Sequence, residues 1–340
     1  MFLGLHYYYF NRALIHSSLN FYAGSFMKSA EVKYRMDLPN FGQFYIEPQA
    51  TFNAWDYLEG KDVVIDKFSP TVLDRIDRKV GVSIGFPLGR QYKAALHGFY
   101  INNDDKYINS DVLTSIDTLD VIKLNGFRTG VSLTTGTLNR KQYPSAGKSF
   151  SFVADWFSVK EKYTPGSTSN INQNVEENRS WIRARVTLQQ YFKSGIYSSG
   201  YYLDGVISNQ PLFTNYQGSL INAPGFYPIQ DSKTLLLQNF RAFNYVAGGW
   251  RNVFNIRNKL DFRLEGYVFK PFEAIIEGQN QEGILDNSFE KIFLAGTGGM
   301  VYHSTVGPIS LSVNYYDDPE NQWGVLLHVG FLLFNKTSME

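Results

Sequence analysis

Polar and apolar residues alternate position by position along most of this chain. The stretch AEVKYRMDL, residues 30–38, places apolar and charged side chains on opposite faces: Val32, Tyr34, Met36 and Leu38 against Glu31, Lys33, Arg35 and Asp37. Similar alternation fills residues 181–189, 260–269 and 308–316. Because successive side chains of a β-strand point to opposite faces, this period of two predicts amphipathic strands. Only residues 72–80 could be argued to be helical, and their surroundings favour a strand.

Turn-forming residues divide the chain into fifteen expected strands. Their ranges are 2–10, 13–23, 29–38, 42–57, 61–87, 91–103, 116–138, 147–161, 179–192, 196–210, 242–256, 259–273, 288–303, 308–317 and 322–336. The connections alternate between short turns and generally longer polar loops, the latter at 102–111, 164–180, 211–241 and 277–287. Short turns on one rim and long loops on the other are typical of an up-and-down membrane barrel.

A membrane barrel explains why each strand has two different faces without a second layer to cover it. Its apolar face contacts lipid, and its polar face contacts a wet lumen. The 23 Tyr and 27 Phe residues would supply aromatic girdles at the membrane interfaces. A large soluble β-protein is the alternative, but charges repeated on one face, uneven loops and the absence of linkers favour the barrel. We expect one all-β domain over residues 1–340, a sixteen-stranded type of antiparallel barrel in the bacterial outer membrane.

Composition narrows the range of functions. Basic and acidic residues number 32 and 31, so nothing indicates a nucleic-acid partner. The chain has no Cys, which excludes disulfides, thiolate metal sites and a Cys nucleophile. Its five His residues are scattered without metal-binding spacing, and the longest apolar runs fall far short of the ~20 residues of a membrane helix. We therefore assign no metal, no cofactor and no helical span.

Two short matches to enzyme motifs lack the structure that their chemistry needs. Residues 81–85, GVSIG, match the nucleophile elbow, which requires a helix directly after the Ser. A Pro-bearing turn into another strand follows instead. The GKS at 147–149 lacks the preceding Gly of a P-loop. We assign no catalytic residue to this chain.

The odd strand count predicts a missing piece. Single-chain bacterial barrels have an even number of strands. We expect one strand to precede residue 1, together with a signal sequence, which the first residues do not contain. The chain then corresponds to an N-terminally truncated fragment.

Three segments resemble one superfamily, that of outer-membrane assembly factors, two-partner secretion barrels and bacterial surface antigens. Residues 296–334 are similar to its last three strands, with Gly307 and Pro308 in the closing hairpin and Gly330 in the last strand. The sequence QNFRAFNY resembles the Arg-Gly-Phe tip of its inward-folded loop, with Arg241, Ala242 and Phe243 in place and Ala242 replacing the Gly. In FRLEGY, Glu265 occupies the place of a lumen-facing acidic residue.

The resemblance is strongest to one branch, the barrels at the C-terminus of patatin-like phospholipases from Bacteroidetes. It implies a membrane anchor and translocator, related to type V secretion, for an upstream passenger or client polypeptide. The passenger would be a phospholipase domain absent from this chain, which itself is not an enzyme. A stand-alone outer-membrane assembly factor and a passive diffusion porin are the alternatives. The oligomeric state is not indicated.

The resemblance also implies a weak seam between the first and last strands, which can open sideways. The closing strand 322–336 would form one side of that seam, and Gly330 would weaken it because Gly has no side chain to pack. For the loop, we expect Arg241 to pair bidentately with a wall carboxylate, Glu265 first and Asp261 second. The alternative is a solvated Arg241 with no fixed partner.

Overall fold

The structure is a computed structural model of the whole chain. It describes residues 2–10, 14–24, 27–38, 43–56, 72–109, 116–287, 290–305, 307–319, 321–331 and 335–340. No helix in these ranges is long and apolar enough to cross a membrane.

Fifteen strands form one continuous sheet, and every neighbouring pair is antiparallel and consecutive along the wall. They are β1 (Phe2–Phe10), β2 (Leu14–Ala23), β3 (Met27–Leu38), β4 (Phe44–Asp56), β5 (Val72–Leu88), β6 (Tyr92–Tyr107), β7 (Asp120–Gly136), β8 (Gly147–Thr164), β9 (Val175–Ser194), β10 (Tyr197–Ser208), β11 (Tyr245–Arg257), β12 (Leu260–Pro271), β15 (Phe293–Ser304), β16 (Gly307–Tyr316) and β17 (Trp323–Val329). A separate hairpin of β13 (Ala274–Glu277) and β14 (Gly283–Asp286) lies in the loop after β12.

The expected all-β, up-and-down fold is confirmed, and each of the fifteen expected strands has a counterpart. The expected strand 61–87 corresponds to β5, which begins at Val72, while 57–71 lie outside the described residues. The expected strand 322–336 was too long, because β17 ends at Val329. Residues 72–80 are strand, as their surroundings indicated.

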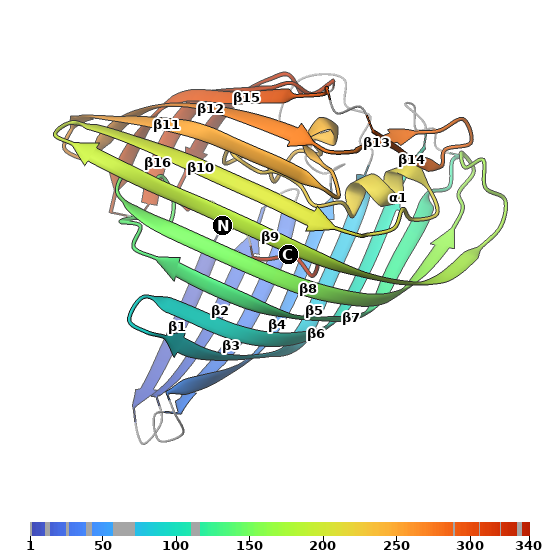
Figure 1. Ribbon diagram of the computed structural model, residues 1–340, viewed down its shortest axis with the longest axis horizontal. Coiled ribbons are helices and arrows are strands. Elements are labelled where there is room, and N and C mark those ends of the chain that lie inside the picture. The colour runs from blue at the N-terminus through green and yellow to red at the C-terminus, as the bar shows by residue number, and fades with distance from the viewer. Residues whose placement is uncertain are drawn as a thin grey trace.

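The sheet curves around a central lumen (Figure 1). The short-turn rim lies at the left of this view, and the long-loop rim, with α1 (Tyr216–Ile221) and the β13–β14 hairpin, lies at the right. One connection departs from the expected asymmetry, because the segment 137–146 on the short-turn rim is longer than its neighbours. β1 and β17 are the two ends of the strand order, and Phe2 of β1 lines one cavity of about 680 Å³ with Gly307 and Pro308 of β16.

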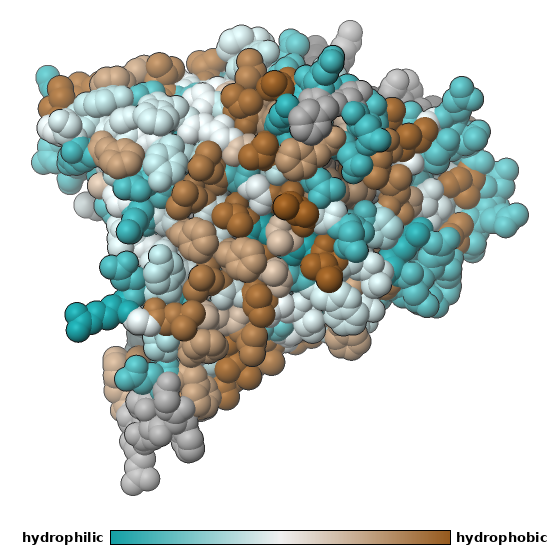
Figure 2. Space-filling model, in the orientation of Figure 1, coloured by the Kyte–Doolittle hydropathy of each residue, from teal (hydrophilic) through white to brown (hydrophobic). Residues whose placement is uncertain are grey.

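The outer face of the wall is a band of exposed apolar side chains. In β12, Phe262, Leu264 and Val268 are exposed, while Asp261 and Arg263, at alternate positions, are buried on the lumen side. Figure 2 shows hydrophobic side chains over the middle of the strands and hydrophilic ones toward the long-loop rim. A single-layered sheet with an apolar outside and a polar inside is what a lipid bilayer requires. The assignment of faces from the sequence is therefore confirmed for this strand.

Near the long-loop rim the polarity of the two faces is exchanged: apolar side chains point inward and charged side chains point outward. This exchange differs from the expected pattern. In the last part of β8, Lys160 and Lys162 point outward and are exposed, whereas Val159 and Tyr163 are buried inside. The same exchange occurs in β7, where Leu124 is buried and the adjacent Lys123 is exposed. An outer face of Lys residues suits water, so these strands continue beyond the lipid band. Their inward apolar side chains have a protein partner, described below.

The GVSIG motif lies in the middle of β5, which continues through Ser83 to Leu88 and turns into β6. A Cβ on Gly81 would meet the carbonyl oxygen of Gly98 at 2.0 Å, and one on Gly85 would meet the Tyr45 ring at 2.1 Å. The two glycines thus allow close packing within the wall, as the sequence context suggested.

Candidate functional site: the occupied lumen

The connection between β10 and β11, residues 209–244, folds into the lumen and packs against distant strands. Helix α1 begins after Asn215, whose side chain accepts a hydrogen bond from the Gly218 amide at 2.9 Å. The Tyr107 hydroxyl of β6 donates to the same Asn215 side chain at 2.6 Å. Arg75 of β5 donates to the carbonyl of Ile221 at 3.2 Å. The inward-folded loop implied by the resemblance is therefore present.

Two apolar clusters hold the loop. Near the long-loop rim, its Phe213 and Ile221 join the inverted inner faces of β6–β9, including Trp181. On the other side, Phe226 and Phe240 pack against inward aromatic side chains of β11, β12 and β16. The lumen wall is thus aromatic where it meets the loop, and not polar throughout as the simple alternation indicated. Burial of apolar surface is the main force that seats the loop.

The predicted pairing of Arg241 with Glu265 or Asp261 is wrong. The Arg241 guanidinium donates to the carbonyls of Ile221 and Ala223, at 2.9 and 3.3 Å, and to the Tyr227 hydroxyl at 3.0 Å. All three acceptors belong to its own loop. Arg241 forms an antiparallel bridge with Gly225, which directs its side chain across the loop and not toward the wall. The alternative of an Arg without a fixed partner is equally wrong.

Glu265 faces the lumen, as expected, but its partners lie on the wall. Arg263 pairs with it at 2.8 Å and Arg251 at 3.7 Å, and the Tyr267 hydroxyl donates to it at 2.5 Å. These donors saturate the carboxylate and leave no role for Arg241. The physical reason for the wrong prediction is that two arginines closer in sequence compete for the same acceptor.

Asp261 does pair with an arginine of a segment that folds into the lumen, but this segment enters from the short-turn rim. Arg140, in the segment 137–146, donates to it at 3.1 Å, and the His303 ring contacts it at 2.7 Å. The same segment places the Tyr143 hydroxyl 2.8 Å from Ser310 of β16. The sequence analysis missed this crossing. Its signal was a connection on the short-turn rim that is too long for a turn.

The other residues of the loop tip are buried. Ala242 is fully buried among the aromatic side chains around Phe226, and Phe243 packs with Leu220 and Ile275. The methyl group of Ala242 fits this cluster without steric conflict. Ala242 and Phe243 thus hold the loop tip in apolar clusters, and Arg241 binds other residues of the same loop.

The closing hairpin residues have a clearer role than the resemblance implied. A Cβ on Gly307 would lie 2.9 Å from the Cα of Gly330, and the Gly330 amide donates to the Pro308 carbonyl at 2.8 Å. Gly330 has a φ of +93°, in the left-handed region that favours Gly. The ladder between β16 and β17 stops at Val329, directly before it. Gly330 thus ends the strand and permits a change of direction.

After this point the chain re-enters the barrel. Residues 335–340, the tail, lie inside the lumen and run across the inner wall from strand to strand. The Asn335 side chain donates to Ser29 of β3 at 2.7 Å. Met339 is 5% exposed and packs in the same apolar cluster as Trp181. The expected strand 322–336 included the start of this segment, and no periodic pattern in the sequence indicates the tail.

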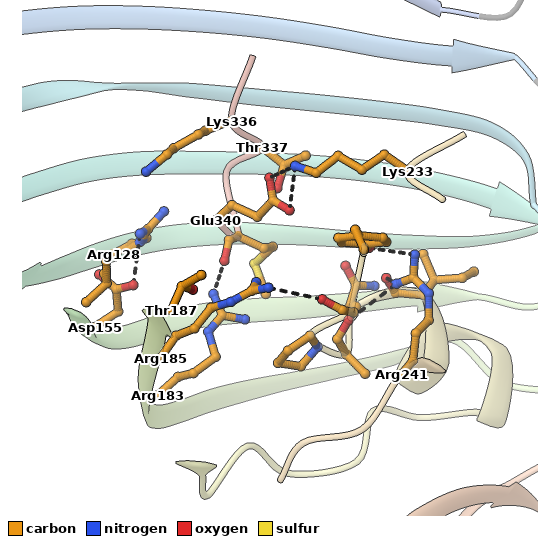
Figure 3. Close-up of a pocket in the computed structure, with 18 of the residues that line it drawn as sticks. Arg128, Asp155, Arg183, Arg185, Thr187, Lys233, Arg241, Lys336, Thr337 and Glu340 are labelled. Atoms are coloured by element: carbon orange, nitrogen blue, oxygen red, sulfur yellow. Dashed lines mark hydrogen bonds and ion pairs between the residues drawn. The ribbon is translucent and has the colours of Figure 1, made fainter. Parts of the chain in front are cut away.

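A cavity of about 340 Å³ is lined by residues of the tail, the loop and the wall (Figure 3). Its charged lining is strongly basic: Arg75, Arg128, Arg183, Arg185, Lys233, Arg241 and Lys336 against Asp155 and Glu340. Arg185 pairs with Asp204 at 2.6 Å and Arg128 with Asp155 at 2.8 Å, while Lys233 lies 3.1 Å from Glu340 of the tail. The described residues contain no cluster of His, Asp and Glu suited to a metal ion. Chemically, the cavity suits anions.

Replacing Gly330 should weaken the docking of the tail. An Ala at a left-handed φ is strained by about 1–2 kcal/mol, although nothing lies within 4 Å of the new Cβ. We expect Gly330→Ala to raise the exposure of the tail to carboxypeptidase roughly five- to thirty-fold. Gly266→Ala is the matched control, since its Cβ also meets nothing and its φ is not positive. Equal digestion of both variants would show that Gly330 does not direct the tail.

Acid should loosen the end of the tail. Burial opposes ionisation of Glu340, but Lys233 and Arg185 outweigh it and lower its pKa to about 2, from an ordinary value near 4.5. Ionised Glu340 therefore stabilises docking above pH 4.5, and this contribution is lost as the pH falls toward 2. A fluorophore on Thr337→Cys should gain mobility over that window. The same probe with Glu340→Gln should show no change there, and an unchanged response would contradict the assignment.

Comparison with solved structures shows the fold of the chain. No family model and no curated protein matches the chain. Among solved structures, BamA from Haemophilus ducreyi lacking POTRA domains 1–3 has a TM-score of 0.54 at 11% identity, over 95% of this chain and 68% of that chain. Two further structures have lower TM-scores. The ferric citrate transporter FecA in the unliganded form has a TM-score of 0.42 at 8% identity, over 95% of this chain and 50% of that chain. The siderophore receptor PirA from Acinetobacter baumannii has a TM-score of 0.39 at 9% identity, over 90% of this chain and 57% of that chain.

The likeness to BamA shows the fold alone at this identity, and the fold is that of a β-barrel of the bacterial outer membrane. The apolar band on the outside of the wall agrees with that location. The expected localisation and barrel architecture are therefore confirmed.

Proposed function

We propose that this barrel anchors an attached passenger, or handles a client polypeptide, at the outer membrane. The observation that carries this proposal is the occupied lumen. The loop 209–244, the segment 137–146 and the tail all enter it, and each is fastened by specific contacts with the wall. A passive diffusion porin requires an open aqueous channel, so these insertions argue against that alternative.

The resemblance extends the proposal to the nature of the passenger. It is a patatin-like phospholipase domain of the kind found in Bacteroidetes, joined upstream, and any lipid hydrolysis takes place in that domain. The barrel itself supplies no catalytic residue and needs no cofactor. Its own partners are outer-membrane lipid and the polypeptide that it carries.

A reporter fusion tests the anchoring role. The chain is exported behind a signal peptide, with a folded reporter enzyme joined before Met1, and cell envelopes are separated by density. We expect the reporter activity in the outer-membrane fraction, and a reporter fused to an unrelated soluble periplasmic domain in the soluble fraction. Reporter activity that stays soluble in both fusions would overturn the proposal.

Single-channel recording separates the alternatives. We expect the intact chain to give little steady conductance in a planar bilayer, whereas a porin would give a large and stable one. A stand-alone assembly factor is the second candidate, favoured by the likeness of the fold to that of BamA. It would speed the insertion of other barrel proteins into liposomes, which an anchor would not do.

A further inference from the structure

The tail is recognised mainly through its backbone. Lys79 of β5 donates to the carbonyls of Lys336 and Thr337, each at 3.0 Å. The next carbonyl, that of Ser338, accepts from Arg128 of β7 at 3.2 Å. The Met339 carbonyl accepts from Arg183 of β9. Four successive carbonyls thus meet three cations that stand on alternate strands of the wall.

The amide of Ser338 is bound as well. It donates to both carboxylate oxygens of Asp77, at 3.0 and 2.8 Å. Asp77 is fully buried and also accepts from Asn53 of β4 at 3.0 Å, which holds the carboxylate in place. Charged groups that bind backbone atoms recognise an extended peptide with little regard to its sequence.

Side-chain selection is confined to the last three positions. Ser338 is completely buried against Asn103, so only a small residue fits there. Met339 enters the apolar cluster, and Glu340 meets Lys233. Lys336, by contrast, is exposed to the cavity, which is also lined by the cations Arg128, Arg183, Arg185 and Lys233. A cation at this position is unfavourable, so the tail is not the best ligand for the wall that holds it.

We propose that the inner wall formed by β5, β7 and β9 is a binding site for an extended polypeptide segment with a small, an apolar and an acidic residue in succession, and that residues 335–340 occupy it as an exchangeable resident. The inference rests on the proposed handling of polypeptide by the barrel. The cavity beside the tail is lined by more basic than acidic side chains, and its volume of about 340 Å³ gives an acidic segment room to enter before the tail leaves.

The test is the binding of a fluorescent NKTSME peptide to the purified barrel in detergent. A chain lacking residues 335–340 should bind the peptide roughly 100-fold more tightly than the intact chain, because a tethered competitor has a high effective concentration. NATSME should bind more tightly than NKTSME, and a peptide with Leu in place of Ser should not bind. A folded deletion variant that binds no better than the intact chain would overturn the proposal.

A thermodynamic cycle identifies the site. N-methylation of the Ser amide of the peptide should weaken binding at least tenfold, since a charge-assisted hydrogen bond is lost. Asp77→Asn in the deletion variant should weaken binding of the ordinary peptide, and N-methylation should then cost little more. Fully additive losses would show that the peptide binds elsewhere.

A variant whose tail is fixed in the lumen by a disulfide tests the site if the deletion variant does not fold. The chain contains no Cys, so Ser338→Cys with Asn103→Cys can form only the intended disulfide. We expect the oxidised protein to exclude the peptide and the reduced form of the same variant to bind it. Equal binding in both states would refute the site. Because these assays need no passenger, peptide binding and anchoring can fail separately.

Discussion

Phe240→Ala should release the loop 209–244 from the lumen. Phe240 is 1% exposed, and its ring lies 5.6 Å from that of Phe269, 6.0 Å from Tyr316 and 6.3 Å from Phe293. Truncation of a buried Phe to Ala costs about 3–5 kcal/mol, which combines lost burial with a cavity. Because Phe240 belongs to the apolar cluster that packs this end of the loop against the wall, most of that loss should fall on its docking. We expect raised proteolysis within 209–244 and a larger conductance.

The matched control for this prediction is Phe254→Ala. Phe254 is 38% exposed on the outer face of β11, so the same chemical change should leave the loop docked and the conductance low. If both variants resemble wild type in proteolysis, the aromatic cluster does not seat the loop. If both are equally open, the effect comes from damage to the wall.

Asp155→Ala should destabilise the barrel by about 3–5 kcal/mol. The Asp155 carboxylate is 4% exposed and pairs with Arg128 at 2.8 Å and with the His97 ring at 2.6 Å. Removing it leaves the Arg128 guanidinium buried beside Arg183 with no counter-charge. Thermal unfolding, followed by the heat-induced shift in electrophoretic mobility, should occur well below the wild-type temperature.

A double variant distinguishes the lost charge pair from a simple packing defect. Asp155→Ala with Arg128→Met removes both charges while an apolar side chain keeps much of the volume. We expect it to recover most of the lost stability, because replacing both partners of a buried pair is often nearly neutral. Additive losses of stability would contradict the view that the uncompensated arginine is the cause.

The wall was largely predictable because its determinants are local. The period of two in residues 181–189 and 260–269 puts Arg185 and Glu265 opposite the apolar side chains of their strands, and both face the lumen in the structure. The phase change near the long-loop rim was also readable, since the apolar members of FSVKEKYT, residues 157–164, are Phe157, Val159 and Tyr163. The expected faces differ from the observed ones there because the outer face of each strand is expected to contact lipid along its whole length.

The contents of the lumen could not be predicted in the same way. The path of Arg241 depends on its bridge to Gly225 within an irregular loop, and no periodic pattern specifies that bridge. The tail reaches partners as distant as Ser29, which lies 306 residues before Asn335. Such contacts arise only once the wall has curved around the polypeptide. Gly330 was recognised from the sequence as a weak point, but its left-handed backbone was not.

The central claim is that lipid lies on one side of this wall and water on the other. Nitroxide labels at Val186→Cys and Thr187→Cys in liposomes test it, because the Val186 side chain is exposed outward and the adjacent Thr187 lines the lumen cavity. We predict that the label at 186 is relaxed by oxygen dissolved in lipid, and the label at 187 by a water-soluble nickel complex. Relaxation of both labels by the nickel complex alone would contradict a membrane-spanning wall.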